Sequence, residues 1–231
     1  MQQEEQSKIN KFSYYFIKAL EFYTLKKDIL VKISFIINFI CIFAFFKIPR
    51  GLVSWQVYGL YFLLFSVISL CSLAYLFAII KELRGKEYST GTSLKRLKKK
   101  AGTLILSSVA FGGVSLIGIL LFILPGIYFA SIYFLHNCYI LDLGESFEDS
   151  YEASKRLTKP FRETLFKYFL IFALIVVATG YVFLSMMATS GSVLIVTFAL
   201  SFFGSVVILI YQRFIAYIYF DIEYNETNNK A

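Results

Sequence analysis

The feature that most constrains this chain is a series of six apolar runs, each long enough to cross a bilayer. They lie at residues 29–48, 57–80, 103–124, 127–143, 168–187 and 193–220. A helix of about 20 mostly apolar residues crosses the hydrocarbon core, so such runs are typical of transmembrane helices. A soluble domain is excluded because 58% of the 231 residues are hydrophobic and only 16% are charged. Soluble chains have about 45–50% apolar and about 25% charged residues. The sequence therefore predicts an all-α, polytopic integral membrane protein.

The third and fourth runs are separated only by Pro125 and Gly126, a pair that is typical of a turn. We therefore predict a tight transmembrane hairpin at this point. The alternative is one kinked helix of about 60 Å, which is twice the hydrocarbon thickness. Six transmembrane helices would then form three hairpins in a single membrane domain. The predicted division is a cytoplasmic amphipathic N-terminal segment (1–28), hairpin 1 (29–80), a basic cytoplasmic connection (81–102), hairpin 2 (103–143), a cytoplasmic amphipathic helix (144–167), hairpin 3 (168–220) and a C-terminal tail (221–231).

The distribution of Lys and Arg predicts the orientation. The connection at 81–102 has eight basic and two acidic residues, a net charge of +6, and the connection at 144–167 has five more basic residues. On the opposite side the sequence places only Lys47 and Arg50. Short loops rich in Lys and Arg stay in the cytoplasm. We therefore expect a multi-pass protein of the plasma membrane with both termini in the cytoplasm.

An amphipathic or basic stretch precedes each pair of apolar runs. Apolar side chains recur at positions 9, 12, 16, 20 and 23, and a second helical stripe runs through 147, 151, 154, 158, 161 and 165, with Ser at 154 and Thr at 158; charges lie on the opposite side of both. Such segments are typical of helices that lie in the membrane interface. Ser146 and Asp149 predict a helix cap, and Pro160 predicts a break near Lys159. The segment at 93–100 is shorter and mostly basic, so the sequence fits either three copies of one unit or three unrelated helix-plus-hairpin segments.

The strongest candidate binding site is the basic cluster beside the third run. It consists of Lys95, Arg96, Lys98, Lys99 and Lys100. Five cations next to a membrane surface should bind anionic lipid, at about 1 kcal/mol for each charge. The alternative is that the cluster only sets the orientation. Nucleic acid is not an expected partner, because the cluster has no aromatic stacking platform.

Four polar residues within the predicted spans are further candidates. His136 and Asn137 lie roughly half-way along the fourth run, and Gln212 and Arg213 lie near the cytoplasmic end of the sixth. Ionisable residues inside a membrane often mark a functional site. His136 and Asn137 fit a polar path, a site for a lipid head group or a proton, or a hydrogen bond between helices. We expect Arg213 to reach the head groups or to pair with Asp142.

The residue inventory offers no catalytic site. The chain has one histidine, and its three cysteines lie in apolar runs without metal-ligand spacing, which predicts buried free thiols. It has neither a phosphate-binding loop nor a nucleophile elbow. We therefore expect no cofactor, no metal and no enzymatic activity. Two functions stay open: support of envelope or lipid homeostasis by binding anionic lipid, a membrane protein or a second copy of the chain, and a small transporter or channel.

Residues 124–170 resemble the signature region of a bacterial membrane-protein family. The matching motifs are Leu-Pro-Gly at 124–126 and Ser-x-x-Leu-Thr-Lys at 154–159. The family comprises the membrane domain attached to some glycerophosphodiester phosphodiesterases and its stand-alone relatives. The chain departs from the pattern at Pro160, where the family usually has Gly, and at Ser150, where it often has Ala. The resemblance implies a six-span helical fold, and it carries over no catalytic residue.

Overall fold

The structure, a computed structural model, describes residues 9–24, 28–48, 55–86, 90–188 and 192–228. This part of the chain is helical and contains no strand. Its elements are α1 (Phe12–Leu20), α2 (Asp28–Lys47), α3 (Trp55–Leu83), α4 (Thr90–Leu121), α5 (Ile123–Tyr133), α6 (His136–Asp142), α7 (Phe147–Thr158), a 3₁₀ turn (Lys159–Phe161), α8 (Arg162–Ala188) and α9 (Val193–Asn228). The all-α prediction is confirmed. Arg50, predicted on the outer side, lies outside the described residues.

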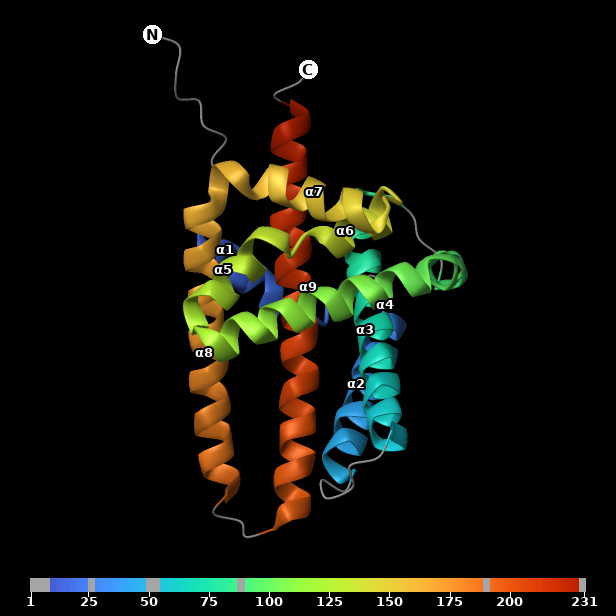
Figure 1. Cartoon of the computed structure of the whole chain (residues 1–231), viewed down its shortest axis with the longest axis vertical. Coiled ribbons are helices and arrows are strands. Elements are labelled where there is room, and N and C mark those ends of the chain that lie inside the picture. Colours follow the sequence, from blue (N-terminus) through green and yellow to red (C-terminus); the bar gives the residue numbers. More distant parts are fainter. Residues whose placement is uncertain (1–8, 25–27, 49–54, 87–89, 189–191, 229–231) are drawn as a thin grey trace.

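Five stretches of the described chain are long and apolar enough to cross a membrane. They are Leu30–Lys47, Trp55–Leu83, Ile123–Asp142, Phe147–Ser185 and Val193–Glu223. In Figure 1, α8 and α9 stand upright, and α2 and α3 lie side by side at the other edge of the molecule. The end of α2, the start of α3, the end of α8 and the start of α9 lie at the same end of the molecule. This arrangement is consistent with a multi-pass membrane protein.

The region predicted as hairpin 2 differs most from the expectation. The basic segment at 93–100 is not a separate surface helix, because it forms part of the first turns of the continuous α4. Helix α5 packs against α4, and both cross α8 and α9 obliquely (Figure 1). The apolar part of α4 is not among the five stretches. The fourth predicted span is also not one helix, because α5 ends at Tyr133 and α6 begins at His136.

Ser154 of α7 explains how the chain tolerates the break between α5 and α6. Its Oγ accepts a hydrogen bond from the Leu135 N–H at 3.3 Å and donates one to the Ile132 carbonyl at 2.8 Å. Thr158 Oγ1 donates to the same carbonyl at 3.1 Å. Buried backbone groups that leave a helix need such partners. The two hydroxyls therefore supply them, and they fix α7 against the break.

The predicted turn at Pro125 and Gly126 is wrong by about one helical turn. Helix α4 ends at Leu121, Phe122 is extended, and α5 begins at Ile123. Pro125 lies in the first turn of α5, where its missing N–H leaves no intrahelical bond unmade. Gly126 touches α4 instead of turning the chain, since a Cβ on Gly118 would lie 2.7 Å from the Gly126 Cα.

The predicted cap at Ser146 and the predicted break near Lys159 are confirmed. The Asp149 N–H donates to Ser146 Oγ at 3.2 Å and caps the start of α7. Pro160 lies in the 3₁₀ turn, after which α8 begins at Arg162. The side chains of α7 that face the molecule are those of Ser150, Ala153, Ser154, Leu157 and Thr158.

For α1 the predicted apolar stripe is only partly right. Phe12 packs against the core as expected, but the fully buried residues are Tyr15 and Ala19. Leu20 and Tyr23, which the stripe included, are 43% and 64% exposed. The buried face is therefore rotated from the predicted stripe, because α1 packs mainly across α9.

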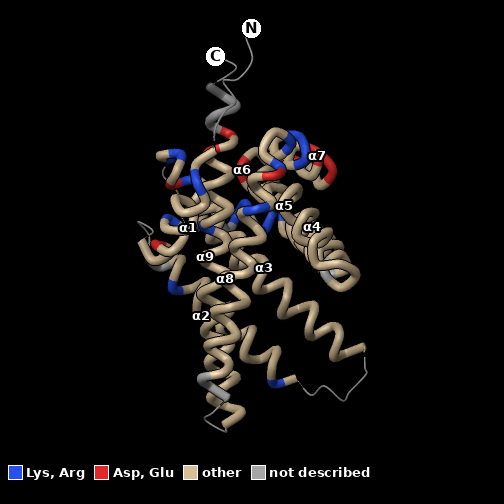
Figure 2. The backbone as a smooth tube through the Cα atoms, turned by 90° about the vertical axis from the view of Figure 1, so that its left-hand side faces the viewer, with Lys and Arg blue, Asp and Glu red and all other residues tan. Residues whose placement is uncertain are grey.

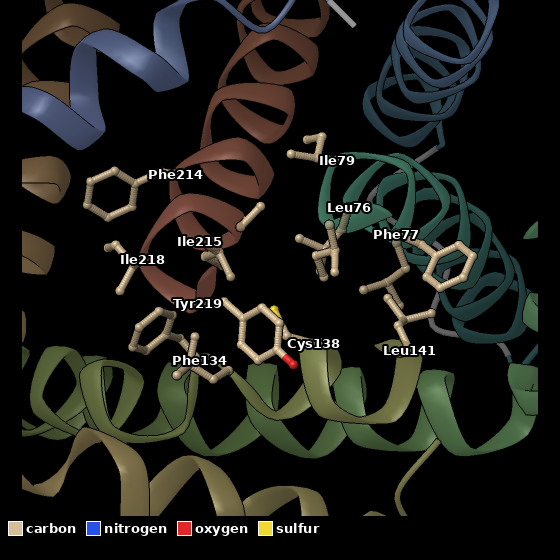
Figure 3. Close-up of a cluster of buried hydrophobic side chains, with 14 of the residues drawn as sticks. Leu76, Phe77, Ile79, Phe134, Cys138, Leu141, Phe214, Ile215, Ile218 and Tyr219 are labelled. Atoms are coloured by element: carbon tan, nitrogen blue, oxygen red, sulfur yellow. The ribbon is translucent and has the colours of Figure 1, made fainter. Parts of the chain in front are cut away.

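The buried core lies where α3, α6 and α9 meet. Figure 3 shows Leu76 and Phe77 of α3, Cys138 of α6, and Ile215 and Tyr219 of α9 gathered at this junction. All five are at most 5% exposed. This junction holds the helices together close to the charged end of the molecule.

Charged residues and exposed apolar residues occupy different parts of the molecule. Figure 2 shows Lys, Arg, Asp and Glu gathered at the end with α1, α6 and α7, while the lower lengths of the long helices carry almost no charge. There Leu174, Val177 and Tyr181 of α8 are 60–72% exposed, and Val193 and Leu194 of α9 are 76% and 57% exposed. Soluble monomers rarely expose apolar patches of more than a few hundred Å². Such a surface is consistent with helices that cross a membrane.

Candidate functional site: a basic helix end and a polar hollow

The five cations of the predicted basic cluster point in two directions from the first part of α4. Lys95, Lys98 and Lys99 are exposed, while Arg96 and Lys100 are half-buried. Among the described residues, no carboxylate forms an ion pair with any of the five. The three exposed ammonium groups are therefore available to an anion.

The two half-buried cations hold the C-terminal end of α6. Arg96 Nη2 donates to the Asp142 carbonyl at 2.9 Å, and Lys100 Nζ donates to the Gly144 carbonyl at 2.9 Å. Cations at a helix C-terminus bind its unpaired carbonyls and are favoured by its dipole. Gly144 has a φ of +82°, which only glycine adopts readily, and a Cβ there would lie 3.4 Å from Arg96 Nη2. These two cations thus connect α4 to α6.

A basic hollow of about 380 Å³ lies at this end of α4. The described residues that line it are Lys95, Arg96, Lys99 and Lys100. Lys98 is outside the lining, so the structure brings four of the five predicted cations to one place. A hollow of this size with cationic walls can hold an anionic group such as a phosphate.

A buried charge cluster that was not predicted from the sequence is centred on Asp142. Its carboxylate, 2% exposed, pairs with Lys81 at 3.2 Å and with Arg84 at 2.8 Å. The Tyr219 hydroxyl donates to the same carboxylate at 3.0 Å. The cluster joins α6 to the end of α3 and to α9. Lys81 follows the second apolar run on the same predicted side as Asp142, and that placement was the available signal.

The predicted roles of Arg213 are wrong. Arg213 is 4% exposed and makes no ion pair with Asp142. Its Nε donates to the Lys18 carbonyl at 2.8 Å, and its Nη2 donates to Thr24 Oγ1 at 3.1 Å and to Tyr217 Oη at 3.2 Å. Arg213 therefore holds the C-terminal end of α1 on α9, because α1 folds over this part of the helix and covers it.

His136 is the first residue of α6 and lies close to α7. Its ring stacks on the Tyr151 ring of α7, with 4.9 Å between the two ring centroids. The Phe111 ring of α4 also packs against the imidazole, tilted and again with 4.9 Å between the centroids. The placement of His136 half-way along a straight fourth helix assumed one continuous helix, whereas α5 ends at Tyr133 and His136 begins α6. The His136 Nδ1 donates to the Tyr133 carbonyl at 2.7 Å. Its Nε2 is buried and has no hydrogen-bond partner among the described residues.

A second hollow, which we call the polar hollow, has a volume of about 290 Å³ and lies beside this histidine. Its walls come from α3, α4, α6 and α9, and they are mostly apolar. The polar groups on the walls include His136, Asn137, Gln212 and Ser108. Asn137 Nδ2 donates to Ser108 Oγ at 3.4 Å, and Asn137 Oδ1 is buried without a partner in the part of the chain that the structure describes. The structure thus brings three of the four predicted intramembrane polar residues together and leaves Arg213 elsewhere.

In the described part of the chain, no group of three or more His, Cys, Asp and Glu side chains lies in a position to hold a metal ion. The prediction of free thiols is confirmed, because Cys41, Cys71 and Cys138 form no disulfide. Cys71 is only half-buried.

Comparison with protein-family models, with curated proteins and with solved structures found no match. The resemblance of residues 124–170 to the phosphodiesterase-associated membrane family stays a prediction.

Proposed function

We propose that this chain is a non-enzymatic membrane protein that supports membrane or lipid homeostasis by binding anionic lipid at the basic end of α4. The observation that carries this proposal is the basic hollow lined by Lys95, Arg96, Lys99 and Lys100. No carboxylate among the described residues neutralises these cations. A phosphate group of a lipid would supply the missing counter-charge.

The position of the hollow along α4 supports a lipid rather than a free anion as its ligand. From Thr103 to Leu121 the same helix carries no charged residue. The α4–α5 connection ends in exposed apolar side chains, with Leu120, Leu121 and Phe122 at 69–75% exposure. The cations at the start of α4 could contact the phosphates of lipid head groups, and the apolar remainder of the helix could contact the acyl chains of the same lipids.

The proposal includes an orientation and a span count. We infer that the charge-rich end, with both termini, faces the cytoplasm of a bacterial cell, and that α2, α3, α8 and α9 cross the plasma membrane. The α4–α5–α6 region would supply the remaining two passages, obliquely and with a break. A thiol reagent that cannot cross membranes tests this in intact cells, on single-cysteine variants of a cysteine-free chain. Cysteine at Lys47 should react and cysteine at Lys98 should not; the reverse pattern would invert the orientation.

The lipid assignment is tested by native mass spectrometry. The purified protein is mixed with phosphatidylglycerol or phosphatidylcholine in detergent, and the lipid that it retains after release from the micelle is measured. The test variant replaces Lys95, Lys98 and Lys99 by Gln together. It keeps Arg96 and Lys100, so their hydrogen bonds to the carbonyls at the end of α6 remain. At about 1 kcal/mol for each charge near the surface, phosphatidylglycerol retention should fall roughly a hundredfold. Phosphatidylcholine retention should not change.

A matched control removes the same charge from another exposed surface. Lys155, Arg156 and Lys159 are exposed at the end of α7 and next to it. Their replacement by Gln should lower phosphatidylglycerol retention much less than the α4 change. Equal losses in both variants would mean diffuse attraction to the membrane and no site on α4.

The transporter or channel hypothesis would have to use the polar hollow. The described walls of that hollow contain no Lys, Arg, Asp or Glu. Ion and solute pathways usually carry charged or densely polar linings. The basic end of α4 therefore supports lipid binding better than the polar hollow supports conduction.

A further inference from the structure

We propose that a third hollow, between α1, α8 and α9, binds one acyl chain of a membrane phospholipid. This apolar hollow has a volume of about 200 Å³. It shares no described lining residue with the basic hollow or the polar hollow. Three features carry the proposal: an apolar lining, an opening among exposed apolar residues, and aromatic side chains that close both ends.

The apolar hollow opens to the surface of the molecule between α8 and α9. Of its ten described lining residues only Phe172 is buried, while Leu20 is 43% exposed and Thr179 is also exposed. Thr179 is the one described lining residue with a polar side chain. Both helices lack charged residues along this length (Figure 2). Because charged side chains avoid the hydrocarbon core, an opening at this level faces acyl chains.

Aromatic side chains bound the apolar hollow along the helix axes. Towards the charged end of the molecule, Phe16 of α1 packs edge-on against Phe172 of α8, with 6.4 Å between ring centroids. At the other end Phe203 of α9 stacks on Phe183 of α8, with 5.6 Å between centroids. A Cβ on Gly180 would lie 3.3 Å from the same Phe203 ring. The apolar hollow is therefore a bounded site, and not an open groove along two helices.

The dimensions fit one acyl chain and exclude a helix of a second protein. One turn of an α-helix with its side chains occupies about 400–600 Å³, which exceeds the volume of about 200 Å³. The lining of α8 runs from Phe172 to Thr179, a length of about 10 Å. An extended carbon chain advances about 1.2 Å for each bond, so this length takes roughly eight methylene groups. It also fits within one leaflet, which is about 15 Å deep.

Two neighbouring valines of α8 allow a matched test. Val176 lines the apolar hollow, whereas Val177 is 69% exposed and lies outside the lining. Val176→Phe therefore places a larger side chain where the acyl chain would lie. Val177→Phe makes the same chemical change on the exposed side of the helix.

The assay is photolabelling of the purified full chain in detergent by phosphatidylcholine with a diazirine at the middle of one acyl chain. Labelled peptides are mapped by mass spectrometry, and thermal melts verify folding. The choline head group gives the lipid no net charge, so the result does not depend on anionic lipid binding at α4. Wild type should be labelled at 172–179 and 203–210, and excess unlabelled phosphatidylcholine should remove this labelling.

The two variants should differ in this saturable labelling. Val176→Phe should weaken it about tenfold, the value of displacing about two buried methylene groups. Val177→Phe should leave it within about twofold of wild type, as expected for a change on an exposed surface. Equal labelling of the two variants would overturn the site.

A second measurement needs only wild type, so it stands if Val176→Phe does not fold. Phosphatidylcholine with the diazirine on its head group should not label 172–179 or 203–210. Equal labelling by the two analogues, or labelling that excess phosphatidylcholine does not reduce, would overturn the proposal. Competition by oleate and not by phosphatidylcholine would replace the phospholipid by a free fatty acid. A dimer in native mass spectrometry that Val176→Phe abolishes would replace it by a second copy of the chain.

Discussion

Asp142→Asn should destabilise the protein strongly, because it breaks the charge cluster that joins α3, α6 and α9. The change keeps the shape of the side chain but leaves Lys81 and Arg84 without their counter-charge at 3.2 and 2.8 Å. Removing one partner of a buried ion pair costs about 3–5 kcal/mol. Lys81 and Arg84 are 16% and 23% exposed, so water compensates in part. We therefore expect a loss of about 3 kcal/mol, the lower end of that range.

In a chain of this length, about 3 kcal/mol corresponds to a fall in melting temperature of roughly 6–12 °C. The assay is thermal unfolding in detergent with a thiol-reactive dye, which reports exposure of the buried Cys41 and Cys138. Tyr219→Phe removes one neutral donor and should cost about 1 kcal/mol. Glu152→Gln, an exposed carboxylate of α7, should change stability by at most about 0.5 kcal/mol. If Asp142→Asn melted within 2 °C of Glu152→Gln, the cluster would not hold these helices together.

Three further changes test local features in the same melting assay. Burial first, and then the charge of Asp149, raise the pKa of the Glu145 carboxyl, so the folded state is penalised when the pH lies above that pKa. Glu145→Gln should therefore melt higher than wild type at pH 7, and the difference should vanish near pH 4, where the unfolded group is also protonated; a difference independent of pH would contradict this. Ser146→Ala removes the α7 cap and should cost about 1 kcal/mol, and no loss would show that the cap is dispensable. Gly118→Ala drives a Cβ into Gly126 and should lower the melting temperature, whereas a melt at or above that of Gly113→Ala would show that α4 and α5 can separate freely.

Local signals in the sequence predicted the elements that they directly encode. Hydrophobicity located α2, α3, α8 and α9, because a lipid-facing helix needs only length and apolar composition. The cap at Ser146 and the break at Pro160 depend on backbone groups within a few residues, so the structure agrees with both.

Features that depend on distant partners were not predictable. The α5–α6 break exists because Ser154, on another helix, satisfies the backbone groups at 132 and 135. The turn was predicted at Pro125 and Gly126, but both residues lie within α5, and Gly126 lets α5 pack closely against Gly118 of α4. An ion pair of Asp142 with Arg213 was one expectation, but the partners of Asp142 are Lys81 and Arg84. Position along the chain does not tell which of several basic residues the fold brings close to a carboxylate. The polar hollow was anticipated only through its residue types, since its walls come from four helices.

The most direct test of anionic lipid binding at the basic end of α4 is to locate the head group by cross-linking. A phosphatidylglycerol analogue with a photoreactive head group would be incorporated into nanodiscs with the full chain, and the modified peptides would be mapped by mass spectrometry. The account predicts that cross-links concentrate on the peptide with residues 95–100, and that excess phosphatidylglycerol competes while phosphatidylcholine does not. Cross-links spread evenly over the basic residues of α1, α4 and α7, with no competition by phosphatidylglycerol, would contradict it.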